Sequence, residues 1–454
     1  MITPPASRRR FLESTAAGMM LAPALGASRT EDPPRRPKVA ALASTYFYLS
    51  HAYHIVGRFL DGFPHYAGGP AAEGRGDSLH RPGFDVASLY IEQASDATDL
   101  GRAKAKAYGV RLSPTIEDAL TLGTGKLAVD AVLLIAEHGD YPLNEKLQKL
   151  YPRGAYFRKV LDVFRASGKV APVFIDKHLS YSRAEGQQMV DQARALGVPL
   201  MAGSSLPVTW RLPELEIPLG RPFREVLVAS RGNLEIFGFH ALETLQCMAE
   251  RRDRKGKTQG VKSVTYLEGP EVWEAGDKGL WSWDLLRHAL GRSHTVNPGD
   301  VRQNCRDFAT PSVRDASTIL RGPNAFVVEY EDGLRATAMI LNGHVDDTTV
   351  AVRTRDSQGR ETIASTLTYL PAPPGARFFD PLVLRIEDFF RSGKPPYPVE
   401  RTLLTGGILD AALDSRIRGH APVATPELAA IDYEAPADSG FIRTPLTDPT
   451  PNRL

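Results

Sequence analysis

Apolar and polar residues follow two different rhythms along residues 38–205. Short apolar runs, of the length of a buried parallel strand, are separated by longer stretches in which apolar residues recur every three or four positions, as in an amphipathic helix. This order predicts strands joined by helices, which is typical of an α/β fold with a doubly wound parallel sheet. The strands are expected at 38–43, 86–91, 131–135, 171–175 and 199–202, and the helices at 51–60, 100–108, 115–122, 156–167 and 183–196.

Residues 206–400 change character, because alternating apolar residues there predict strands of an antiparallel sheet. Two of these strands, 327–330 and 334–341, are separated by a turn that contains Asp332-Gly333, a favoured hairpin pair. We therefore expect a second, α+β domain with an open, largely antiparallel sheet, and a closing helix and tail at 401–454. The other elements expected here are strands at 225–229, 348–355 and 362–369 and helices at 240–251 and 407–418.

The first 27 residues have the pattern of an export signal. Three arginines precede a short, weakly apolar stretch that ends in small residues, and this stretch is shorter than the ~20 apolar residues that span a bilayer. The run Ser7-Arg8-Arg9-Arg10-Phe11-Leu12 resembles the twin-arginine signal, which implies export to the periplasm. Residues 28–37, rich in proline and arginine, are expected to be a linker. We exclude both segments from the predicted domains and expect no membrane span.

Composition and charge narrow the class of protein. The chain has 454 residues, of which 42% are hydrophobic and 24% charged, as in soluble globular proteins and unlike disordered or polytopic membrane chains. Its 55 Lys and Arg residues nearly balance 53 Asp and Glu residues, with no basic stripe, so we expect no nucleic-acid partner. Two cysteines, Cys247 and Cys305, are too few for a disulfide framework or a four-thiolate metal site. Enzymes and small-molecule binding proteins remain.

Polar and ionisable residues follow every predicted strand of the first domain. In a doubly wound sheet the carboxyl ends of the strands border the binding crevice, so these side chains are expected to surround one site. Their density exceeds what loop composition requires. In strand order they are Ser44, Thr45, Tyr46, Tyr48, His51 and His54; Glu92; Glu137, His138, Asp140 and Tyr141; Asp176, Lys177 and His178; and Ser204 and Ser205.

Four stretches, at 100–110, 129–135, 173–178 and 238–243, carry motifs in a characteristic order. The third stands where a known family has Glu-Lys-Pro, and the fourth is similar to its Gly-x-His-x-x-Asp. Together they resemble the Gfo/Idh/MocA oxidoreductases over nearly all of the mature chain. The resemblance implies a Rossmann-like domain, an NAD or NADP cofactor, and oxidation of a sugar or sugar derivative. It is also compatible with a homo-oligomer, because the second sheet often forms the dimer interface in this family.

The resemblance assigns roles to particular residues. Lys177 corresponds to the active-site lysine near the carbon that is oxidised, His240 to the catalytic histidine, and His178 replaces the proline beside the lysine. A histidine titrates near neutrality and a lysine can stabilise a developing alkoxide; the alternatives are a surface lysine and a packed histidine. The other expected contacts are Thr45, Tyr46, Glu92 and His138 with the dinucleotide, and Asp140, Tyr141 and Glu243 with the substrate.

The turn after the first strand departs from the family. Relatives carry Gly-x-Gly-x-x-Gly there, whose glycines let the backbone approach the pyrophosphate at a helix N-terminus, whereas residues 43–51 contain no glycine. Tyr46 and Tyr48 would occupy space that a dinucleotide normally fills. The family's catalytic aspartate falls on Ile236, with Glu235 one position away. These departures argue against a bound dinucleotide.

The histidines suggest a divalent metal ion as the alternative cofactor. His51 and His54 share one face of a predicted helix, and with His138 they are candidate ligands of zinc or a similar ion. Their spacing is not a recognised metal motif, so no ligand set is assigned. Three functions remain open: a periplasmic oxidoreductase acting on a sugar, a non-redox sugar-processing enzyme (hydrolysis or elimination, with or without a metal), and a non-catalytic sugar-binding protein.

Overall fold

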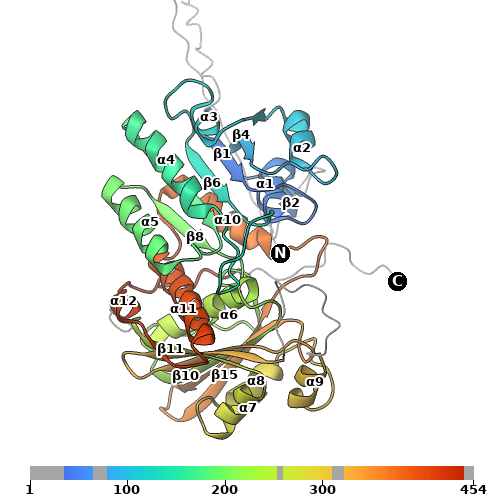
Figure 1. Ribbon diagram of the computed structural model, residues 1–454, viewed down its shortest axis with the longest axis vertical. Coiled ribbons are helices and arrows are strands. Elements are labelled where there is room, and N and C mark those ends of the chain that lie inside the picture. The colour runs from blue at the N-terminus through green and yellow to red at the C-terminus, as the bar shows by residue number, and fades with distance from the viewer. Residues whose placement is uncertain (1–34, 65–78, 253–258, 309–321, 444–454) are drawn as a thin grey trace, which may run out of the picture. The chain divides into compact units, whose positions relative to one another are not determined.

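The structure, a computed structural model, describes residues 35–64, 79–252, 259–308 and 322–443. The predicted signal at 1–27, most of the linker and the end of the tail lie outside the described residues. From Arg36 onward the chain forms one unit that contains a six-stranded and an eight-stranded sheet (Figure 1).

The six-stranded sheet is parallel throughout, with the strand order β5-β4-β1-β6-β7-β8. Its central strands are the predicted apolar runs, and they are buried because helices cover both faces. The order reverses direction between β1 and β6, which is where sheets of this kind bind ligands. This confirms the predicted Rossmann-like, doubly wound domain. The strands are β1 (Lys38–Ala43), β4 (Asp85–Ile91), β5 (Arg111–Leu112), β6 (Ala131–Ile135), β7 (Val173–Asp176) and β8 (Leu200–Gly203).

The expected helices of this domain are all present, and local signals determine their ends. The side chains of Ser50, Thr115 and Ser182 accept hydrogen bonds from backbone amides of the first turn. Gly197 ends α5 in the left-handed conformation, with φ of 66°. The helices are α1 (His51–Asp61), α2 (Gly101–Tyr108), α3 (Ile116–Thr121), α4 (Arg153–Ser167) and α5 (Arg183–Leu196), and two short strands, β2 (Phe63–Pro64) and β3 (Leu79–His80), pair beside α1.

The eight-stranded sheet has the order β16-β11-β12-β13-β10-β14-β15-β9 and is antiparallel except for the β10–β13 pair. The predicted Asp332-Gly333 hairpin joins β12 and β13, and Gly333 has the positive φ that its turn requires. This confirms the predicted α+β domain. The strands are β9 (Trp210–Leu212), β10 (Phe223–Ser230), β11 (Val261–Glu268), β12 (Asn324–Tyr330), β13 (Arg335–Ile340), β14 (Thr348–Arg355), β15 (Glu361–Tyr369) and β16 (Val423–Ala424).

Helices cover both faces of this second sheet, which was predicted as an open sheet. Alternate residues of β10 point to opposite sides, so Val226 and Val228 join the core beneath α6, while Leu227 and Ala229 pack with Trp281. Figure 1 shows α6 and α11 on one side and α7 and α8 on the other. The helices of this half are α6 (Ile236–Ala249), α7 (Pro270–Asp277), α8 (Trp283–Leu290), α9 (Val301–Phe308), α10 (Phe379–Ser392), α11 (Val399–Ile417) and α12 (Pro426–Ala429), with a 3-10 turn at Glu250–Arg252.

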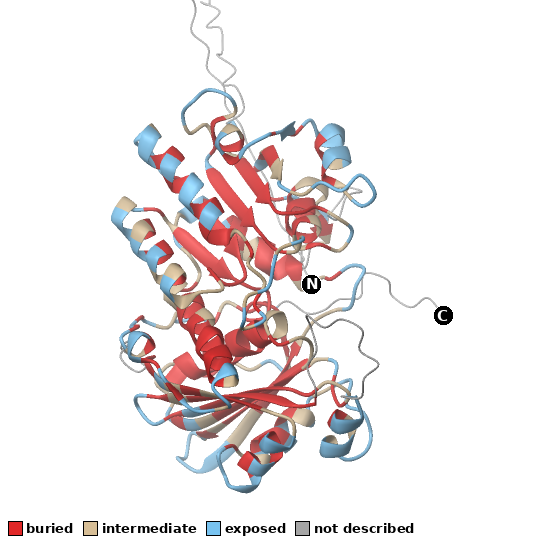
Figure 2. Ribbon diagram, in the orientation of Figure 1, coloured by how far each residue is buried: buried red, intermediate tan, exposed pale blue. Residues whose placement is uncertain are grey.

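Two helices of the C-terminal part join the two sheets. The closing helix α11 begins at Val399, well before the predicted start at 407, and packs against α5, α6, β8 and β11; Figure 2 shows it buried along nearly its whole length. Helix α10, which the sequence analysis did not predict, packs against α1. Among the described residues, no helix has both the length and the apolar character needed to cross a membrane.

Candidate active site

Lys177 directly follows β7 and belongs to a buried cluster of three charged side chains. Its ammonium Nζ donates to Glu137 Oε1 at 2.8 Å, and the guanidinium of Arg153 binds the other oxygen of the same carboxylate. All three side chains are almost completely buried. Burial alone would raise the pKa of Glu137, but Lys177 and Arg153 hold it well below its ordinary value. Glu137 is therefore ionised, and it fixes the position of the lysine.

The backbone at this strand end is itself unusual. Lys177 has φ of 65°, a left-handed conformation that a lysine rarely adopts, and His138 after β6 has φ of 67°. Lys177 N donates to Gly203 O at 3.0 Å, which ties the end of β7 to β8. Backbone conformations of this kind are concentrated at functional sites.

His51, the first residue of α1, forms a second ion pair in the site. Its Nδ1 lies 2.6 Å from Asp176 Oδ2, so α1 is joined to the end of β7 across the end of β6. Only 1% of the Asp176 side chain is exposed, against 15% for His51. The His51 ring also meets the rings of His138 and Phe379 edge-on, with centroids 5.3 and 5.1 Å apart.

The predicted His240 and Glu243 lie one turn apart on α6, which brings residues from the second half of the chain to the same strand ends. Ser204, after β8, donates to Glu243 Oε2 from its backbone N at 2.8 Å and from its hydroxyl at 2.5 Å. Burial raises the pKa of Glu243 to about 7. A carboxyl group with this pKa can exchange a proton at neutral pH.

The remaining histidines of the site are held neutral. Burial lowers the pKa of His138 to about 4. Burial, with Lys177 and His51, lowers the pKa of His240 well below its ordinary value, and burial, with Arg153, lowers that of His178. Neutral imidazoles can accept or donate hydrogen bonds to hydroxyl groups without adding charge. His178 Nε2 lies 3.7 Å from Glu235, the residue that sequence analysis placed next to the family's aspartate.

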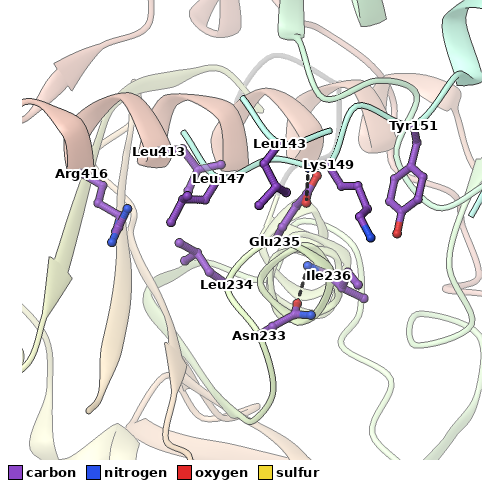
Figure 3. A pocket seen from close by; sticks show the side chains of 10 residues that line it. All are labelled: Leu143, Leu147, Lys149, Tyr151, Asn233, Leu234, Glu235, Ile236, Leu413 and Arg416. Carbon is purple, nitrogen blue, oxygen red and sulfur yellow. Dashed lines mark hydrogen bonds between the residues drawn. The ribbon is translucent and has the colours of Figure 1, made fainter. Parts of the chain in front are cut away.

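Glu235 lines a neighbouring cavity, as does Ile236, the residue onto which the family's aspartate falls. Glu235 precedes α6 and accepts a hydrogen bond from the backbone N of Lys149 at 2.9 Å, as Figure 3 shows. The cavity lies between the segment after β6, the start of α6, and α11, and encloses about 70 Å³, which is room for a few water molecules only. Leu143, Leu147 and Leu413 supply its apolar wall.

Three predicted site residues, Glu92, Asp140 and Tyr141, make contacts at the end of β4 and not with Lys177, Glu137 or Arg153. Tyr141 donates to the exposed Glu92, and the backbone of Asp140 bonds the side chain of Gln93. Beside them lies a groove of about 440 Å³ that Thr45, Gln93 and Gly139 help to line. Thr45 Oγ1 has no hydrogen-bond partner within the part of the chain that the structure describes. Glu92, Asp140 and Tyr141 thus take part in contacts at the end of β4 and not in the Lys177–Glu137–Arg153 contacts.

The turn between β1 and α1 does not fit a dinucleotide in the place where this fold holds one. Ser50 Oγ accepts from Tyr53 N at 3.1 Å and so caps the helix end that would receive a pyrophosphate. Rings from Phe47, His138, His51 and Phe379 pack around that helix end. Ser44, next to β1, already donates to the backbone of Glu137 at 2.8 Å.

Tyr46 contributes to this misfit in a different way from the one expected. The sequence predicts its side chain in the space of the dinucleotide, whereas Tyr46 is buried against α1 and α2, where Gly57 and Gly101 leave room for it. A Cβ atom at Gly101 would lie 3.0 Å from that of Tyr46. Phe47 lines the groove of about 440 Å³, His51 packs edge-on against Phe379, and Tyr48 is exposed.

The three histidines proposed as metal ligands are not arranged around a common point. His51 binds Asp176, whereas His54 contacts Arg58 and stacks on Phe379 with centroids 4.7 Å apart. Burial and Arg58 lower the pKa of His54 to about 3. Across residues 35–64, 79–252, 259–308 and 322–443 there is no group of three or more His, Cys, Asp or Glu side chains placed to hold a metal ion.

Two residues of the site have no role predicted from the sequence. Arg153 was not a candidate, and Asp176 was a candidate without an assigned role. Arg153 lies at the start of a helix that was expected to begin at 156, and nothing in its local pattern shows that it faces Glu137. Asp176 was noted after its strand, but its partner His51 is 125 residues away. A buried acidic residue at a strand end was the only signal available.

Comparison with known proteins places the fold. No protein-family model matches the sequence, and no curated protein matches it. The solved structure of GenD2 from gentamicin A biosynthesis, in complex with NAD, is similar over 86% of this chain and 96% of its own, at 15% identity and a TM-score of 0.50. The structure of Lactobacillus casei myo-inositol dehydrogenase, in complex with NAD(H) and myo-inositol, is similar over 86% of this chain and 97% of its own, at 12% identity and a TM-score of 0.50.

A third similar structure belongs to a protein of a different kind. A super-repressor mutant of Gal80p from Saccharomyces cerevisiae covers 87% of this chain and 100% of its own, at 8% identity and a TM-score of 0.51. The fold therefore does not determine the activity. The chain has the two-domain fold of the Gfo/Idh/MocA-type proteins, in which nicotinamide-dependent dehydrogenases are found.

Proposed function

We propose that the protein is an enzyme that carries out non-redox, acid–base chemistry on a sugar or sugar derivative, without a dinucleotide in the first domain. The observation that carries the proposal is the buried Lys177–Glu137–Arg153 group beside neutral His240, at the sheet edge where this fold binds ligands. A binding protein has no need to bury so many ionisable groups in defined pairs, because each costs solvation energy. The resemblance of residues 7–12 to a twin-arginine signal supports activity in the periplasm.

Each residue has a role that its surroundings support. The ammonium of Lys177, fixed by Glu137, stabilises negative charge that develops on a substrate oxygen. His240 and His178 hydrogen-bond substrate hydroxyl groups as neutral rings. Glu243 supplies an exchangeable proton near pH 7. A hydroxyl-rich substrate suits such a set of donors and acceptors, and a protein of the same fold has myo-inositol bound.

Substitution of Lys177 and His240 tests the catalytic site. The wild-type protein is incubated with a panel of sugars, polyols and glycosides, and products are followed by NMR and mass spectrometry. We expect Lys177→Ala and His240→Ala each to lower turnover by about 10²–10⁴-fold. Lys106→Ala, an exposed lysine on α2, is the matched control and should turn over at the wild-type rate. Wild-type rates in both site variants would refute the assignment, and binding of a sugar without turnover would favour a sugar-binding protein.

The second candidate is a nicotinamide-dependent oxidoreductase acting on a sugar. The groove of about 440 Å³ beside Thr45 and Gln93 favours this function, because it leaves space open next to the ends of β1 and β4. Proteins of this fold also have NAD bound. The test is native mass spectrometry of the exported protein, with metal analysis and the ultraviolet spectrum of released small molecules. We expect no NAD or NADP and no divalent ion; one dinucleotide per chain would establish the redox function instead.

A further inference from the structure

We propose that His51 is the proton acceptor of this site and that Asp176 orients it; this rests on the proposed function. The pair joins the first turn of α1 to the end of β7 and lies next to Lys177 in the sequence and at the same sheet edge. His51 enters the reaction from the turn where other proteins of this fold bind their cofactor. The catalytic base therefore takes the place of the pyrophosphate.

The geometry determines which nitrogen of His51 is basic. Asp176 is buried and its Oδ2 lies 2.6 Å from Nδ1, and an ionised carboxylate can only accept a hydrogen bond. Nδ1 therefore carries the proton, and Nε2 holds the free electron pair. Among the described residues, none is hydrogen-bonded to Nε2. The pairing of Asp176 with Gly203 in β8 fixes the backbone that carries the carboxylate.

The other histidines of the site lack this arrangement. His138 and His240 each have a buried ring nitrogen without a partner among the described residues, and neither ring is paired with a carboxylate. His178 is 3.7 Å from Glu235, beyond hydrogen-bond distance. A proton taken up by His138 or His240 would create a charge with no carboxylate in direct contact, and His178, although within ion-pair distance of Glu235, is buried. His51 alone in this set combines a carboxylate partner with partial access to solvent.

Charges of both signs surround the His51 ring. Asp176 contacts Nδ1 directly, and the Glu137 carboxylate also acts electrostatically on the ring. The ammonium of Lys177, at the same sheet edge, and the dipole at the N-terminus of α1 act in the opposite sense. Asp176 is the carboxylate in direct contact, so it is placed to balance an imidazolium formed during the step.

The proposed step is a single proton transfer. The O–H bond of a substrate hydroxyl group breaks, His51 Nε2 forms an N–H bond, and the electron pair remains on the substrate oxygen. The ammonium of Lys177 stabilises the resulting alkoxide, and Asp176 stays ionised opposite the imidazolium. No oxidant or metal is required for this step.

Histidine-selective ¹⁵N labelling and NMR test the pair without a substrate. We expect a downfield, hydrogen-bonded Nδ1 proton and an unprotonated Nε2 that disappear in His51→Gln. They should persist in His54→Gln, the matched histidine one turn further along α1. Absence of this resonance from the wild type would refute the His51–Asp176 pair itself.

Kinetics with a substrate identified by the sugar panel test the catalytic role. We expect His51→Ala and Asp176→Asn to lower kcat by about 10²–10⁴-fold while KM changes little. Added imidazole should partly restore His51→Ala but not Lys177→Ala, whereas exposed His288→Gln should behave as wild type. If Lys177→Ala is inactive and His51→Ala is not, the proposed function stands and the role of His51 is refuted. If the wild type turns over no substrate, both fail.

Discussion

At the residue scale, the site contains two buried glutamates whose surroundings shift their pKa in opposite directions. Glu137 contacts two cations, Lys177 and Arg153, and its pKa lies well below the ordinary value. Glu243 is equally buried, and within the described part of the chain it accepts hydrogen bonds only from Ser204, so burial dominates. Such divergence between two carboxyl groups is how one site holds a fixed anion and an exchangeable proton at the same pH.

The raised pKa of Glu243 predicts a specific pH dependence of stability. The carboxyl group titrates at about 7 in the folded protein against an ordinary value of 4.5, so the folded state binds the proton more tightly than the unfolded state. Below about pH 4.5 both states are protonated and folding carries no cost from this group. Between about pH 4.5 and 7 the unfolded state ionises first, and stability falls by up to about 3 kcal/mol.

Urea unfolding of the wild type and Glu243→Gln from pH 4.5 to 8 measures this effect. The glutamine variant cannot ionise, so the difference in unfolding free energy should move in its favour as the pH rises and should level off above about pH 7. Glu137→Gln is the contrasting variant, because its carboxylate stabilises two buried cations; it should lose stability across the whole range. A pH-independent difference for Glu243→Gln would show that its pKa is ordinary.

At the element scale, the sequence predicts helices and strands well, but it predicts poorly which elements distant in the sequence pack against each other. The runs 38–43 and 131–135 form strands with the predicted bounds, and Ser182 and Gly197 cap α5. These signals depend on residues within a few positions of one another. Apolar periodicity shows which face of an element is buried but does not identify what covers it. The presence of α10 over α1, and thus of Phe379 against His51, could not be deduced from either segment alone.

The residues of the candidate site show the same difference between local signals and long-range packing. The rule that strand ends meet at one sheet edge agrees with the contact between Lys177 and Glu137. His240 and Glu243, taken from the similarity of segment 238–243 to a known motif, lie near the same strand ends. That these residues form a functional site stays a prediction. The pairing of His51 with Asp176 required side-chain orientation, which depends on the packing of Phe379 and His138 around α1. The direction of the Tyr46 side chain could not be predicted either. It depends on the space left by Gly101, a small residue on α2.

At the scale of the whole molecule, the second sheet is enclosed by its own chain. The expectation of a homo-oligomer came from the resemblance to a family in which this sheet often forms the dimer interface. Here α7 and α8 cover one face of the sheet, and Trp281, Leu285 and Leu286 pack on Leu227 and Ala351. A homo-oligomer stays a prediction. Trp273 and Trp281 therefore belong to the core on this face of the sheet.

This role of the tryptophans predicts unequal losses of stability on substitution. Trp281 is almost fully buried, donates from Nε1 to Val272 O at 2.8 Å, and lies against Gly276, so Trp281→Ala should lower the free energy of unfolding by about 3–5 kcal/mol. Trp283 is half-buried and its ring is partly covered by Arg302, so Trp283→Ala should lower it by about 1–2 kcal/mol. Urea unfolding followed by circular dichroism measures both. Equal, small losses would mean that α7 and α8 are not part of the core, and the face of the second sheet would then be available to a partner subunit.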